Sequence, residues 1–157
     1  MQNLMNLFQF TYLLLLFNFL FSSGLKAQVE FNGKGILGKW RIVDVKTDED
    51  KTIMEIWEKN GNYFAKIIDI PGLTEEEKNS TFCKKSTDKR KGQKLVGMEI
   101  ISNLQKGKEK YSEGDILDLS KGKIFKCDIW LENEDRLKVR THVPIIYKEE
   151  VWLRKTD

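Results

Sequence analysis

The sequence has few of the residues on which metal centres and nucleophilic catalysis depend. Its 157 residues include two cysteines, two prolines and a single histidine, His142. This inventory excludes zinc sites built from four cysteines, from two cysteines with two histidines, or from three histidines. It also leaves a Ser/His/Asp triad only one possible base. We therefore expect no metal site and no cofactor.

The overall composition is that of one ordinary globular domain. Apolar residues make up 40% of the chain and charged residues 32%, with eleven glycines. These proportions exclude a disordered chain or a collagen-like repeat, and the length argues against several domains.

The N-terminal segment lacks acidic residues before Glu30 and contains an apolar run at residues 13–21, broken by Asn18. Small residues follow, so we expect residues 1–27 to be a signal peptide cleaved after Ala27, with Gly24 as the alternative position. The missing positive residue before the run is unusual for such a peptide. A retained anchor is the alternative, but the uninterrupted run is shorter than the ~20 residues that span a bilayer. We expect an exported domain at residues 28–157.

Basic residues are concentrated in one segment of the expected mature chain. Residues 74–94 hold seven basic and four acidic side chains. One interpretation of this excess of positive charge is a solvated loop. The other is that the 84–94 basic loop binds an anionic lipid or an envelope protein. Nucleic acid is not expected as a partner, because Phe82 is the one aromatic residue among these charges.

Apolar residues of the mature chain recur at a spacing of two in short runs, which is typical of half-buried strands. Asn60-Gly61 lies between two of these runs and predicts a tight hairpin. Around Glu75–Lys78 a short helical turn is conceivable, but the surrounding Ser, Thr and Lys favour a loop. Eight strands are expected, at residues 39–45, 52–58, 63–70, 95–101, 113–117, 123–131, 136–143 and 149–154.

Eight antiparallel strands in this length fit a sandwich or a closed barrel, and closure leaves no exposed sheet edge. Gly38-Lys39-Trp40 opens the first strand and Arg154 closes the last. In lipocalin-like barrels, a Gly-x-Trp on the first strand is covered by an arginine from the final strand. Trp40 and Arg154 fit that pairing, which favours an all-β, eight-stranded lipocalin-like barrel.

Short motifs follow one another along nearly the whole mature chain: Gly38-Lys39-Trp40, Glu55-Ile56-Trp57-Glu58-Lys59-Asn60-Gly61, Cys83, Val96-Gly97-Met98, Gly114-Asp115-Ile116-Leu117-Asp118, Gly122-Lys123, Leu137-Lys138-Val139-Arg140 and Val151-Trp152-Leu153-Arg154. This ordered set resembles the exported bacterial family called domain of unknown function 2147. The resemblance implies a lipocalin-like barrel exported to the periplasm or beyond by a Gram-negative bacterium, with no established activity. The chain departs from the family where Cys83 is followed by Ser86 instead of a second cysteine, at Asp118-Leu119, and at Arg140-Thr141-His142.

Two interpretations of the cysteines remain open. In an oxidising compartment, Cys83 and Cys127 could form a disulfide that stabilises the fold by about 4 kcal/mol. Alternatively Cys127, which shares a strand face with Phe125 and Ile129, is a small core residue beyond the reach of Cys83. Redox catalysis is not expected, because the Cys-x-x-Cys spacing is absent.

Acid–base groups are sparse, and each has a structural explanation. Asp118 has the position of a turn residue, and Asp115 that of an outward strand residue. His142 alternates with charged residues, so we expect it to face solvent without a neighbouring nucleophile. Asp44 and Glu55 form the other possible pair. We expect no catalysis. A further hypothesis is a hydrolase that acts through Asp115 or His142.

An eight-stranded barrel is either filled by its own side chains or holds one small ligand. We expect a monomer that binds a small apolar or amphiphilic molecule, and the alternative is a structural or protein-interaction module with a filled core. Arg140 lies outside by strand parity but would be the counter-ion of an acidic ligand in a polar lumen. The candidate lumen residues are Ile56, Ile67, Met98, Ile100, Phe125, Ile129, Leu137, Val139 and Arg140.

Overall fold

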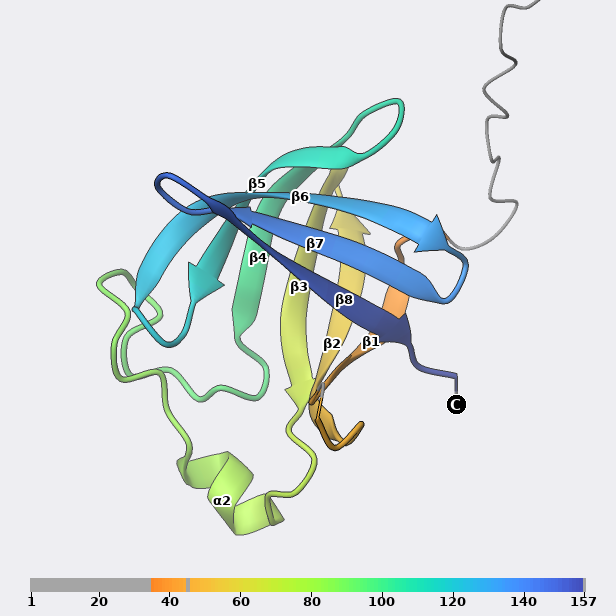
Figure 1. The fold of residues 1–157 in the computed structure, drawn as a ribbon. Coiled ribbons are helices and arrows are strands. Elements are labelled where there is room, and N and C mark those ends of the chain that lie inside the picture. Colours follow the sequence, from red (N-terminus) through yellow and green to blue (C-terminus); the bar gives the residue numbers. More distant parts are fainter. Residues whose placement is uncertain (1–34, 45, 157) are drawn as a thin grey trace, which may run out of the picture. The chain divides into compact units, whose positions relative to one another are not determined.

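A computed structural model describes residues 35–44 and 46–156, which form a closed barrel of eight antiparallel strands (Figure 1). Each strand pairs with the next, and β1 pairs with β8. The predicted eight-stranded barrel is confirmed, whereas the expected signal peptide at 1–27 lies outside the described residues. The strands are β1 (Gly38–Val43), β2 (Asp50–Lys59), β3 (Asn62–Asp69), β4 (Glu99–Lys106), β5 (Tyr111–Asp118), β6 (Lys123–Asn133), β7 (Arg136–His142) and β8 (Tyr147–Arg154).

The predicted hairpin forms between β2 and β3. Asn60 and Gly61 have φ angles of 54° and 76°, and Lys59 pairs with Asn62 across the turn. Positive φ at both central residues matches the right-handed twist of the flanking strands, which explains the Asn-Gly preference.

The fourth strand begins four residues later than predicted. Residues 95–101 were expected to be extended, but Met98 N–H donates to the Leu95 carbonyl and Gly97 has a φ of 91°. This turn precedes β4, so the strand starts at Glu99. The Val96-Gly97-Met98 segment carries apolar residues, and their spacing alone could not reveal the turn.

A short helix, α2 (Glu75–Ser80), stands where a loop was favoured. Thr74 caps it: the Glu77 N–H donates to the Thr74 hydroxyl, and the Thr74 N–H donates to the Glu77 carboxylate at 2.8 Å. This reciprocal capping box stabilises the first turn. No helix in the described part of the chain is long and apolar enough to cross a membrane.

The up-and-down strand order divides the connections between the two ends of the barrel. The β1–β2, β3–β4, β5–β6 and β7–β8 connections lie at one end, which we call the loop end. The β2–β3, β4–β5 and β6–β7 turns lie at the other, which we call the terminal end because β1 begins and β8 ends there (Figure 1).

Strand register identifies the side chains that face the interior. Ala65 pairs with Ile101, which pairs with Ile116, and all three are buried. Since directly paired residues share a face, Ile100 belongs to the opposite face. The prediction that Ile100 lines the lumen is therefore wrong: Ile101 occupies that place.

Ile100 is buried although it lies on the outer face of β4, and the β3–β4 connection contacts this strand next to it. Arg90, itself buried, donates from Nη1 to the Glu99 carbonyl at 3.3 Å. Arg90 also binds Asp88, whose other oxygen accepts a hydrogen bond from the Ser86 hydroxyl at 2.6 Å. The basic segment at residues 84–94 therefore contains an ion pair of its own, between Arg90 and Asp88.

Candidate functional site

The terminal end of the barrel is closed by Arg154 and Trp40. The Arg154 guanidinium carbon lies 4.2 Å from the centre of the Trp40 ring. Its Nη2 donates to the Gly35 carbonyl at 2.7 Å and its Nη1 to the Leu37 carbonyl at 3.2 Å. The Trp40 indole N–H donates to the Ile36 carbonyl at 2.8 Å. A cation–π contact and three hydrogen bonds therefore hold this end together.

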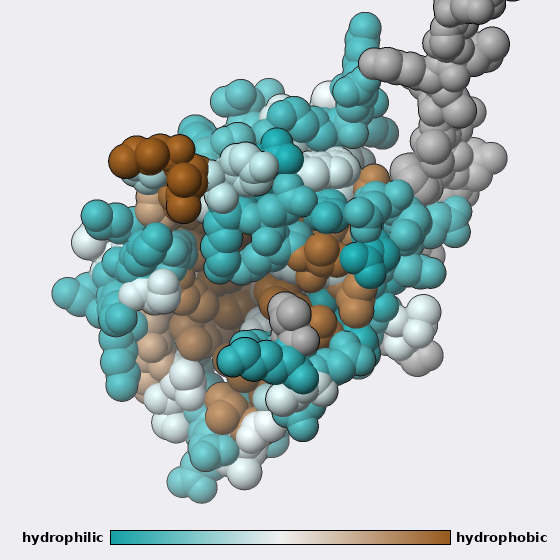
Figure 2. Space-filling view, viewed as in Figure 1, coloured by the Kyte–Doolittle hydropathy of each residue, from teal (hydrophilic) through white to brown (hydrophobic). Residues whose placement is uncertain are grey.

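Most of the predicted lumen residues are buried in one apolar cluster. Phe125 is half-buried and packs against this cluster. Figure 2 shows apolar side chains lining a recess between the tip of the β7–β8 hairpin and the β3–β4 connection. The buried members of the predicted set are Ile56, Ile67, Met98, Ile100, Ile129, Leu137 and Val139, of which Ile100 lies on the outer face of β4.

Arg140 does not face the interior, so its proposed role as a lumen counter-ion is wrong. Its neighbour Val139 is buried, which places Arg140 on the outer face of β7. There the guanidinium lies 5.0 Å from the Trp130 ring centre and 4.5 Å from that of Tyr147. It also pairs with Glu149 at 3.0 Å.

Two charged residues that the lumen prediction omitted share the interior face of β8 toward the loop end. Val139, which is buried, pairs with Glu150, and Thr141 pairs with Lys148. Lys148 Nζ lies 2.5 Å from Glu150 Oε1, and this hydrogen bond raises the pKa of Lys148. Residues two apart on a strand share a face, so Glu150 and Lys148 share the face of Trp152. This spacing is the sequence signal that could have placed both residues inside the barrel.

Trp152 carries an unusual polar group inside the barrel. Its side chain is 1% exposed and is paired with buried Leu137. The indole Nε1 is fully buried, and among the described residues it has no hydrogen-bond partner. Buried donors are almost always satisfied, so this group calls for an acceptor that the described chain does not supply.

Of the two interpretations of the cysteines, the Cys83–Cys127 disulfide is wrong, because both cysteines are free and buried. Cys127 lies inside the barrel wall, where a side chain on Gly114 would come within 2.8 Å of its sulfur. Cys83 belongs to the β3–β4 connection, with its N–H bonded to the Gln93 carbonyl. Burial raises the pKa of Cys127 to about 12, so its unreactive thiol form persists at neutral pH.

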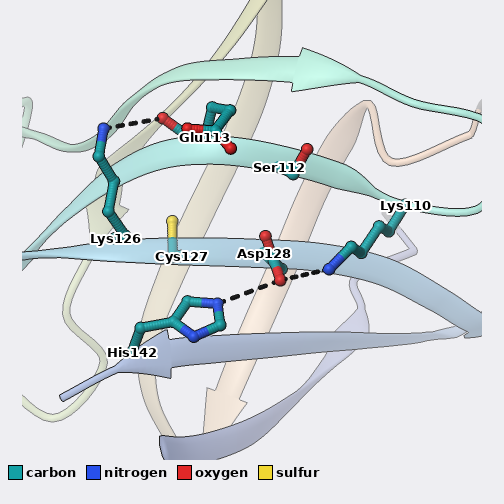
Figure 3. A pocket seen from close by; sticks show the side chains of 7 residues that line it. All are labelled: Lys110, Ser112, Glu113, Lys126, Cys127, Asp128 and His142. Carbon is teal, nitrogen blue, oxygen red and sulfur yellow. Dashed lines mark hydrogen bonds and ion pairs between the residues drawn. The ribbon is translucent and has the colours of Figure 1, made fainter. Parts of the chain in front are cut away.

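A polar pocket of about 360 Å³ lies on the barrel wall across β5, β6 and β7 (Figure 3). At its centre, Asp128 Oδ2 lies 2.6 Å from Lys110 Nζ and 3.1 Å from His142 Nε2. Burial acts to raise the pKa of Asp128, but the hydrogen bonds from Lys110 and His142 outweigh it and lower the pKa. The pocket is lined by Lys110, Ser112, Glu113, Lys126, Cys127, Asp128 and His142.

A β-bulge creates this pocket. The β5–β6 register shifts between Tyr111 and Gly114, and Glu113 between them has a φ of 61°. The extra residue interrupts the ladder and opens the wall beside Cys127. Sequence reasoning missed Lys110 and Asp128 because neither lies in a motif and their contact spans 18 residues.

The pocket brings a histidine that is hydrogen-bonded to Asp128 together with two hydroxyl- or thiol-bearing residues, but it lacks an activated nucleophile. Cys127 is protonated, and within the described residues His142 hydrogen-bonds Asp128 and not Ser112. Activation of a serine requires that contact. The arrangement therefore supports an ion pair that fastens β6 to β7 and to the β4–β5 turn.

The carboxylates considered for acid–base chemistry are not brought together. Asp115 pairs with Lys126 at 2.8 Å, and Asp118 accepts from the Ser120 N–H at 2.9 Å. Asp44 pairs with Lys51 and Glu55 with Lys66. In residues 35–44 and 46–156, no group of three or more His, Cys, Asp or Glu side chains could hold a metal ion.

A closed antiparallel barrel with a tryptophan on its first strand beneath an arginine from its last is a lipocalin-like fold. The family model described as "Uncharacterized protein conserved in bacteria (DUF2147)" matches residues 38–154, and the chain belongs to this family. In fold, the chain is similar to protein HP1028 from Helicobacter pylori, which is described as a member of the lipocalin family. That similarity has a TM-score of 0.64 and 20% identity, covering 77% of this chain and 83% of the other. No curated protein matches the chain.

Proposed function

We propose that the barrel binds one small amphiphilic molecule in its interior, as a monomer and without chemistry. The observation that carries this proposal is the buried indole N–H of Trp152. An unsatisfied buried donor costs about 1–3 kcal/mol, and a ligand acceptor would recover that energy. The apolar residues around it suit the remainder of such a ligand.

The surroundings of Trp152 also restrict the chemistry of the acceptor. Leu137 is its strand partner, and Arg154, the nearest cation along β8, already donates to three backbone carbonyls. A carboxylate buried here would lack a counter-ion, which is costly. A neutral carbonyl, as in a ketone, ester or amide, fits better.

Access from the loop end follows from the closure of the terminal end. Arg154 and Trp40 occupy the terminal end, whereas the Lys148–Glu150 pair lies toward the loop end. A ligand that enters past this pair would place its carbonyl next to the Trp152 indole N–H. Its hydrocarbon chain would lie along the apolar side chains of the barrel interior. The proposal also places the mature chain, beginning at Gln28, in the envelope of a Gram-negative bacterium or outside the cell.

Native mass spectrometry with matched ligands tests this function. The mature protein is mixed with 2-dodecanone or with dodecane, which share chain length but differ in the acceptor. We expect one bound ketone per chain, and weaker ketone binding in Trp152→Phe, which keeps an aromatic ring but has no N–H. Trp57→Phe, on the outer face of β2, is the control. Equal ketone binding by the Trp152→Phe variant would contradict the role of the indole N–H. No binding at all would contradict the proposal and favour a filled core.

A further inference from the structure

The large hydrophobic side chains that are exposed in the described residues all lie at the loop end. Three separate segments contribute: the β3–β4 connection, the β5–β6 turn with the start of β6, and the β7–β8 hairpin with the start of β8. Because alternate connections of this barrel share one end, these side chains gather there. They are Phe82, Leu119, Ile124, Ile145, Ile146 and Tyr147.

The tip of the β7–β8 hairpin is the most exposed of these segments and forms the strongly hydrophobic projection in Figure 2. Ile145 is 103% exposed, Ile146 68% and Tyr147 60%. Ile145 also has a φ of 78°, a conformation that β-branched residues rarely adopt. Consecutive isoleucines held in water at a strained turn contribute nothing to the core, and an exposed apolar cluster of this kind marks an interaction surface.

Unpaired cations accompany the apolar tips. Lys84, Lys89 and Lys91 are exposed in the β3–β4 connection, and Lys123 is exposed at the start of β6. In the part of the chain that the structure describes, these four lysines form no ion pair, whereas the neighbouring Lys121 pairs with Asp118. Residues 84–91 and the start of β6 thus place free positive charge beside the protruding apolar groups of the loop end.

We propose that the loop end docks on an anionic lipid bilayer, with the Ile145–Ile146 tip in the interfacial region and the lysines against phosphate headgroups. Interfacial binding combines buried apolar area with attraction to anionic lipids, and both components are present here. The exposed apolar side chains form several separate protrusions at one end of the barrel. A lipid bilayer can adapt to such protrusions, whereas a protein interface usually has one continuous apolar centre. This inference goes beyond the proposed function and does not depend on the interior ligand.

Vesicle flotation tests the docking. The probes are vesicles of equal parts phosphatidylglycerol and phosphatidylcholine, with vesicles of phosphatidylcholine alone for comparison. We expect the mature protein to float with the anionic vesicles. Ile145→Ser/Ile146→Ser and Lys84→Gln/Lys89→Gln/Lys91→Gln should each weaken the partition roughly tenfold or more. Lys59→Gln/Lys106→Gln/Lys108→Gln removes the same charge from the terminal end and should change it little.

Several outcomes would overturn the proposal. They are the absence of flotation, equal flotation with neutral vesicles, and equal losses from the two lysine triples. Capture of an envelope protein without vesicle binding would assign the surface to a protein partner instead. Unchanged circular dichroism confirms that the variants fold. Trp152→Phe should still float, so failure of interior binding and failure of docking are separately visible.

Discussion

Arg154, the last residue of β8, covers Trp40 on β1 at 4.2 Å and bonds to the carbonyls of Gly35 and Leu37 that precede that strand. The Arg154 side chain therefore connects β8 to β1 and to the residues that precede β1. The β1–β8 ladder itself contains only two paired positions among the described residues. Closure of the barrel consequently depends on this side chain as well as on the backbone.

Replacing Arg154 by lysine should destabilise the barrel by about 2–4 kcal/mol. Lysine keeps the charge but loses the planar fork that contacts the indole and donates to several carbonyls at once. Urea unfolding monitored by tryptophan fluorescence measures the change. Arg136→Lys, at an exposed pair with Glu132, is the matched control and should have little effect. Equal stability of Arg154→Lys and the parent would show that the backbone ladder alone closes the barrel.

Replacing Asp128 by asparagine should produce a pH-dependent loss of stability. Because the pKa of Asp128 is lowered in the folded state, its contribution is present above the ordinary value of 3.8 and disappears as the pH falls through the lower folded value. We expect about 1–3 kcal/mol at pH 7. Urea denaturation across pH 2–7 measures the difference from the parent. A difference that stays constant across this range would contradict the ion-pair assignment.

Adding one methyl group at Gly114 should destabilise the β5 bulge. A Cβ there would lie 2.7 Å from Leu104 Cγ and 2.8 Å from Cys127 Sγ, closer than van der Waals contact allows. Gly114→Ala should cost about 1–3 kcal/mol, and Cys127→Ala should recover part of the loss in the double variant. Additive effects in this double-mutant cycle would show that the two residues do not press on each other.

Both thiols should resist labelling in the native protein. Cys83 and Cys127 are free and buried, and the pKa of Cys127 is raised to about 12 by burial. A thiol reagent should therefore react with both only after denaturation, and the intact mass should match the fully reduced chain. Rapid native labelling would contradict the burial. A mass two hydrogens lower would restore the disulfide.

Local patterns in the sequence were sufficient for the fold. The spacing of two, the Asn60-Gly61 turn and the Trp40 and Arg154 pair each depend on chemistry that is visible within a few residues. The local capping box of Thr74 and Glu77 was overlooked, and the error at Ile100 arose because long-range packing decides which residue faces the interior. Ile100 and Ile101 are both apolar, and only the register with Ala65 places Ile101 inside.

The functional residues were harder to predict for the same reason. An unsatisfied indole N–H at Trp152 is a property of its surroundings, and no residue pattern reports it. The Lys110–Asp128–His142 cluster requires the bulge at Glu113. A Cys83–Cys127 disulfide was possible by count, but Cys127 lies on β6 and Cys83 in the β3–β4 connection, and both remain free, which the sequence does not reveal.

The most direct test of interior binding is the indole N–H resonance of Trp152 during titration with 2-dodecanone. The chain has four tryptophans, so the 15N-labelled protein should show four indole signals, with that of Trp152 assigned by its loss in Trp152→Phe. We predict that this signal moves downfield and saturates at one ketone per chain, while dodecane produces no such shift. An unmoved Trp152 signal at saturating ketone would contradict the account.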